Sequence, residues 1–161
     1  MTIVISHNSK MIANLYPPLL ALHGWLRWVV LAAALAAIFV AFAGWGGDKP
    51  IGRLRLFTII FVIAIDLELL LGLVLFFWLS PATHVAFADF AAAMKYNEPR
   101  FFTVEHTTTM LLAVICAHVG AALSRKGRTD RMKFRGAALG YSISLVLMLA
   151  GIPWWRPLLR F

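Results

Sequence analysis

The sequence has little of what a soluble enzyme usually carries. It holds one cysteine, Cys116, so a disulfide framework within the chain is excluded. No stretch resembles a phosphate-binding loop or a catalytic nucleophile motif, which argues against an independent enzyme. Charged residues make up only 14% of the chain, whereas hydrophobic residues make up 61%. This composition is typical of a protein that crosses a membrane several times.

The net charge of +8 raises nucleic-acid binding as another explanation of the composition. The basic residues, however, gather at the ends of apolar runs, where membrane topology and anionic lipid headgroups account for them. We therefore expect a lipid bilayer around the protein and no nucleic-acid partner.

Four apolar runs are each long enough for a helix across a bilayer core of about 30 Å. They cover residues 19–45, 55–80, 101–124 and 136–155. Pro17 and Pro18 precede the first run, which predicts a helix that begins after them. The connection 81–100 predicts one short amphipathic helix on the membrane surface. We therefore predict an all-α integral membrane four-helix bundle, in up-down-up-down order, with residues 1–161 as a single domain.

The basic residues also predict an orientation. The connection 46–55 holds three basic residues and one acid, and 124–135 holds six basic residues and one acid. By contrast, 81–100 holds two of each. Cytoplasmic connections carry the excess of Lys and Arg, so 46–55 and 124–135 are expected inside. Both termini are then expected outside.

Ionisable side chains inside the spans are the strongest hint at function, because each needs a partner, a cavity or a cofactor in hydrocarbon. His23 and Arg27 come early in the first span, and Glu105 and His106 come early in the parallel third span. At a rise of about 1.5 Å per residue, these groups lie at similar depths. Two opposed imidazoles, His23 and His106, are suited to bind a haem iron. Histidines that only satisfy hydrogen bonds are the equally common alternative.

Two further interpretations concern the remaining polar groups. Arg27 is expected either to pair with Glu68 of the second span, which lies at a matching depth, or to anchor a haem propionate. Glu105 is either an acid near a helix N-terminus, favoured by the helix dipole, or a second-shell partner of the haem site.

A separate pair is expected deeper in the membrane. His118 follows His106 by twelve residues and so lies about 18 Å deeper, too far to share its site. Asp66 and Glu68 point about 200° apart on one helix, so Asp66 is expected to face His118 instead. A buried Asp–His pair is the simpler interpretation, and a proton relay is the alternative.

Four stretches together resemble a family of small four-span bacterial membrane proteins labelled cytochrome b-like. They are "LHGWLRWVVLAA" (22–33), "LELLLGLVLFFWLSP" (67–81), "RFFTVEHTTTMLLAVICAHVG" (100–120) and "GIPWWRPLLR" (151–160). The resemblance covers most of residues 19–160. It implies a bacterial inner membrane, electron transfer and b-type haem. In the second span the family pattern has His and Gln where this chain has Asp66 and Glu68.

Three functions are expected in decreasing order. The first is a b-type haem protein that transfers electrons within a larger redox assembly, with His23 and His106 as axial ligands, Arg27 on a propionate and Glu105 as second shell. The second is a cofactor-free accessory subunit of a respiratory or photosynthetic complex, in which the same polar groups fix helix register. The third is proton conduction through Asp66, Glu68 and His118.

Overall fold

The computed structural model describes the backbone of residues 2–156 and the side chains of residues 14–156. Its long helices are α1 (Thr2–Ala43), α2 (Ile51–Val74), α6 (His106–Lys126) and α7 (Asp130–Gly151). A π-helical turn, η1 (Leu75–Leu79), continues α2, and another, η2 (Phe101–Glu105), leads into α6. The all-α four-helix bundle predicted from the sequence is confirmed.

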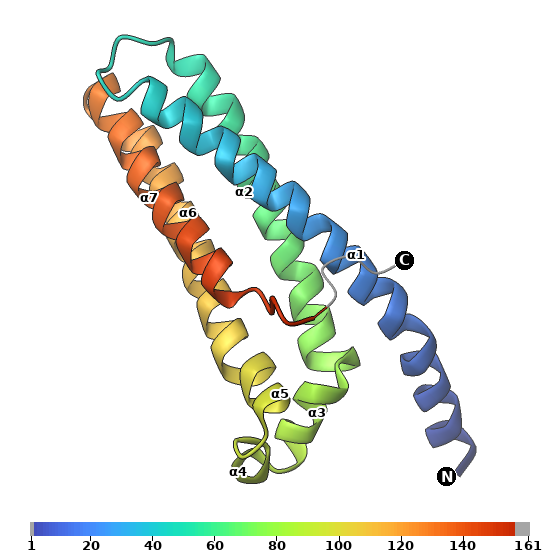
Figure 1. The fold of residues 1–161 in the computed structure, drawn as a ribbon. Helices are drawn as coiled ribbons and strands as arrows, with labels where there is room; N and C mark the ends of the chain where they lie inside the picture. The colour runs from blue at the N-terminus through green and yellow to red at the C-terminus, as the bar shows by residue number, and fades with distance from the viewer. Residues whose placement is uncertain (1, 157–161) are drawn as a thin grey trace.

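The long helices run up and down in turn (Figure 1). The connection between α1 and α2 lies at the same end of the bundle as the connection between α6 and α7 (Figure 1). The short helices that join α2 to α6 lie at the opposite end. The two most basic connections of the sequence therefore share one end of the bundle.

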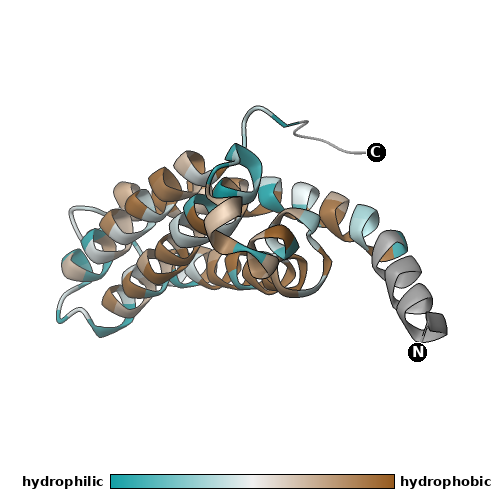
Figure 2. Cartoon of the chain, turned by 90° about the horizontal axis from the view of Figure 1, so that it is seen from below, coloured by the Kyte–Doolittle hydropathy of each residue, from teal (hydrophilic) through white to brown (hydrophobic). Residues whose placement is uncertain are grey.

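Within the described part of the chain, four helices are long and apolar enough to cross a membrane. They are Asn14–Ala43, Ile51–Leu79, Asn97–Lys126 and Asp130–Gly151. Their outer faces carry large exposed apolar side chains, and Figure 2 shows hydrophobic residues along the length of the bundle. Soluble proteins rarely expose apolar surface on this scale. The fold is that of a multi-pass membrane protein.

The first helix differs from the prediction at its start. We expected it to begin after Pro17 and Pro18, but α1 runs through both from Thr2. Each proline removes one helical hydrogen bond. In membrane helices that loss is commonly tolerated, because neighbouring groups satisfy the freed carbonyls. The expectation that the two prolines mark the helix start is therefore wrong.

The connection between α2 and α6 also differs from the prediction. It forms α3 (Pro81–Ala88), α4 (Phe90–Ala93) and α5 (Asn97–Arg100) in place of one amphipathic helix. Asp89 divides the segment, because its backbone is extended and its side chain accepts a hydrogen bond from the Ala92 N–H at 2.9 Å. An aspartate of this kind caps a new helix and so prevents the preceding one from continuing.

Small residues bring α6 and α7 close together. A Cβ built on Gly140 would lie 2.5 Å from the Cα of Gly120, so the two backbones touch at this level. One turn away, the buried Ser144 hydroxyl donates to the Ala113 carbonyl at 2.7 Å. Close approach at small residues and hydrogen bonds between helices are typical of association within a membrane. This hairpin holds His106 against the end of α7.

Candidate cofactor site between α1, α2 and α6

A cavity of about 180 Å³ opens between the helices at the end of the bundle that carries the short helices. Apolar side chains form most of its wall, among them Phe76 of η1 and Phe102 of η2. His23 and Arg27 of α1, Glu68 of α2 and His106 of α6 supply most of its polar groups. An apolar pocket with a few convergent polar groups is the usual form of a cofactor or ligand site.

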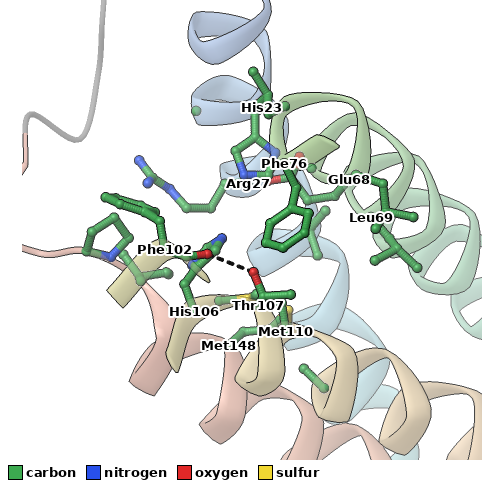
Figure 3. A pocket seen from close by; sticks show the side chains of 18 of the residues that line it. His23, Arg27, Glu68, Leu69, Phe76, Phe102, His106, Thr107, Met110 and Met148 are labelled. Carbon is green, nitrogen blue, oxygen red and sulfur yellow. Dashed lines mark hydrogen bonds and ion pairs between the residues drawn. The ribbon is translucent and has the colours of Figure 1, made fainter. Parts of the chain in front are cut away.

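The two predicted histidines meet in this cavity. The ring centroids of His23 and His106 lie 6.4 Å apart, and the ring planes make an angle of 80°. Figure 3 shows His23, Arg27 and Glu68 on one side of the cavity, and His106 with Phe102 and Thr107 on the other. The sequence argument from equal depth on parallel helices therefore places these two rings correctly near each other.

The hydrogen bond of His106 determines which of its nitrogens is free. Its Nδ1 lies 2.8 Å from the Gly151 carbonyl oxygen at the end of α7. Because a carbonyl can only accept, Nδ1 carries the hydrogen. In the neutral ring Nε2 then has a lone pair and is available to ligate.

His23 has a similar partner on α2. Its Nδ1 lies 3.2 Å from Oε1 of Glu68, within ion-pair distance, although the angles are not those of a hydrogen bond. The other carboxylate oxygen, Oε2, is buried and makes no hydrogen bond among the described residues. A carboxylate or carbonyl beside the second ring nitrogen is the usual environment of a histidine that ligates a metal. Both histidines have this environment.

Arg27 shares the Glu68 carboxylate with His23. The guanidinium interacts electrostatically with Glu68, and its Cζ lies 5.5 Å from the centre of the Trp28 ring. The acid that we assigned to Arg27 alone thus also contacts a histidine. This leaves both expected roles of Arg27 open, because the side chain lines the cavity and has an acid nearby.

Glu105 lies outside this cavity, contrary to its expected place beside the haem site. Its Oε1 accepts a hydrogen bond from Nε of Arg100 at 2.8 Å, and 41% of its side chain is exposed. The π-helical turn of η2 separates the two residues by five positions and allows this pairing. Glu105 therefore has a surface ion pair as its contact.

The deeper pair forms as expected between α2 and α6. Nε2 of His118 lies 2.8 Å from Oδ1 of Asp66, and neither side chain lines the cavity. The pair is not buried, however, because 47% of the His118 side chain and 41% of the Asp66 side chain are exposed. The expectation of a buried pair is wrong in this respect.

Sequence reasoning missed Arg156, which also lines the cavity. Its Nη2 contacts Oε1 of Glu98, and its Cζ lies 4.3 Å from the centre of the Phe102 ring. The signal was present in "GIPWWR", where Pro153 ends the helix and turns the chain back over the cavity. Arg27 and Arg156 thus give the cavity two cationic side chains.

The residues of the cavity fit a haem. Two imidazoles with their Nδ1 atoms engaged can supply two axial ligands, and the two arginines suit propionates. Gly24 has open space where a Cβ would stand, and a Cβ at Gly72 would lie 3.4 Å from Cε1 of His23. In residues 14–156 no three His, Cys, Asp or Glu side chains gather to hold a bare metal ion. A haem needs only two protein ligands, because its macrocycle supplies the other four.

The chain matches no protein-family model, no curated protein and no solved structure.

Proposed function

We propose that this protein binds one b-type haem between His23 and His106 and transfers electrons as a subunit of a larger redox assembly in a bacterial inner membrane. The observation that carries the proposal is the pairing of each Nδ1 atom, His106 with the Gly151 carbonyl and His23 with Glu68. This pairing directs the remaining nitrogen of each ring to ligation. A haem held in this way changes its charge by one electron at a time.

The chain's own residues would have distinct tasks. Gly151 and Glu68 hold the two rings in orientation, and the apolar wall excludes water and so influences the redox potential. Arg27 and Arg156 are placed to neutralise carboxylates at the cavity wall. Asp66, which departs from the family pattern, lies outside the cavity. Its replacement of the usual His therefore removes no side chain from the proposed site.

The orientation belongs to the same proposal. With the connections 44–50 and 127–129 inside, both termini and the short helices face outside. The haem would then lie in the outer half of the bilayer, where an external redox partner has access to it.

A cofactor-free accessory subunit is the second candidate. The contacts of His106 with Gly151 and of His23 with Glu68 also join helices to each other, which is what a register-fixing network would do. The two candidates differ in one property, because only the first gives a coloured protein.

Substitution of the histidines tests the proposal. His23→Leu and His106→Leu should each remove the reduced-minus-oxidised b-type absorption bands, whereas His118→Leu, the matched control, should retain them. His106→Ala should regain bands when imidazole is added, which separates lost ligation from lost folding. Bands that persist in both His23→Leu and His106→Leu would contradict the assignment of the ligands.

A further inference from the structure

The Asp66–His118 pair lies on the outer surface of the bundle, within the candidate membrane spans of α2 and α6. The two side chains are hydrogen-bonded at 2.8 Å and remain 41% and 47% exposed. Ionisable groups exposed to hydrocarbon are costly, and in membrane proteins they almost always face protein or water. This surface therefore needs a covering group that the single chain does not supply.

The residues around the pair form a seam for helix packing. On α2 the exposed or half-exposed positions repeat at spacings of four, three and four, and α6 repeats the same spacing. The α2 positions are Ile59, Ile63, Asp66 and Leu70, and the α6 positions are Leu111, Ile115, His118 and Ala122. We call these two stripes the α2/α6 seam. This spacing is that of helices packed knobs-into-holes, where one polar position among apolar ones fixes register and oligomeric state.

The hydrogen-bonding capacity of the pair indicates what covers it. Among the described residues, His118 and Asp66 hydrogen-bond only to each other. Because net charge is costly in hydrocarbon, the pair shares one proton, either as aspartate with imidazolium or as aspartic acid with imidazole. In both forms one ring N–H donor and one carboxyl oxygen acceptor are left over. The pair is therefore complementary to a second copy of itself.

We propose that the α2/α6 seam is the interface of a two-fold dimer of this chain, in which His118 of each copy donates to Asp66 of the other. A two-fold interface brings the same patch of both subunits together, so residue i meets j and j meets i. Two copies inserted in the same direction are related by an axis along the membrane normal, which preserves depth. Asp66 and His118 satisfy this condition, because their hydrogen bond places them at one depth.

Cross-linking in native membrane vesicles tests where the copies meet. In a Cys116→Ser background, Ile115→Cys lies in the seam, and Val146→Cys, on α7 and 65% exposed, is the matched control. A short bifunctional maleimide should give a product of twice the chain mass for position 115 and little for position 146. No dimer at position 115, equal cross-linking at both positions, or a product of another mass would each overturn the proposal, the last because a different polypeptide then covers the seam.

A second measurement tests the role of the polar pair. Asp66→Leu with His118→Leu should weaken dimerisation in liposomes about tenfold, as followed by energy transfer between labelled copies, because two interhelical hydrogen bonds are lost. The exchange Asp66→His with His118→Asp should restore the wild-type value. Equal association in all three proteins would overturn the assignment of the pair to the interface. The haem proposal is unaffected by either result, because the pair lies outside the cavity.

Discussion

Glu68 on α2 lies 3.2 Å from the Nδ1 atom of His23 on α1. The same carboxylate interacts with Arg27, one turn along α1. A single acid therefore influences both the orientation of a proposed ligand and the charge of a proposed propionate partner. Contacts beside a metal-ligating histidine typically contribute 10- to 100-fold to metal affinity. Glu68 thus links the stability of the bundle to the chemistry of the cavity.

Glu68→Gln should weaken haem binding by about 10- to 100-fold and destabilise the bundle by about 3–5 kcal/mol, because it leaves the Arg27 guanidinium without its acid. Arg27→Met combined with Glu68→Gln should recover much of the stability, as measured by denaturant unfolding in micelles. Losses of stability that simply add in the double variant would show that the two charges are not coupled.

Gly140→Val should destabilise the α6–α7 hairpin by about 1–3 kcal/mol or more, because its side chain would meet the backbone of Gly120. Gly52→Ala is the matched control, since nothing lies within 4 Å of a Cβ at Gly52. Alanine there should stabilise the helix slightly. The free energies of unfolding of the two variants give the comparison, and equal values would contradict the close crossing of the helices.

In a Cys116→Ser background, Arg128→Cys should react with a membrane-impermeant maleimide only from the cytoplasmic side, because 124–135 holds the largest excess of basic residues. Lys95→Cys, on the opposite end of the bundle, should react only from outside. The reverse pattern would overturn the orientation.

Much of the fold was predictable because four long apolar runs leave few alternatives to helices in a membrane. The depth of each polar residue was predictable for a related reason, since helical rise is fixed. His23 and His106 were thereby brought together correctly, as were Asp66 and His118.

The direction in which side chains point was much harder to predict. In a span that is apolar all round, polarity does not mark the buried face, so the exposure of the Asp66–His118 pair was not foreseen. Small residues carry that information instead, as in the buried series Ala113, Ala117 and Ala121 of α6. The π-helical turn before His106 rotates Glu105 away from the cavity, and no sequence signal for such turns was read.

The most direct measurement is the reduced-minus-oxidised absorption spectrum of the wild-type protein, purified from cells with haem available during expression. We expect b-type bands and about one haem per chain, because the two imidazoles of the cavity have their Nδ1 atoms engaged. A colourless protein that is folded under these conditions would contradict haem binding and favour the cofactor-free subunit.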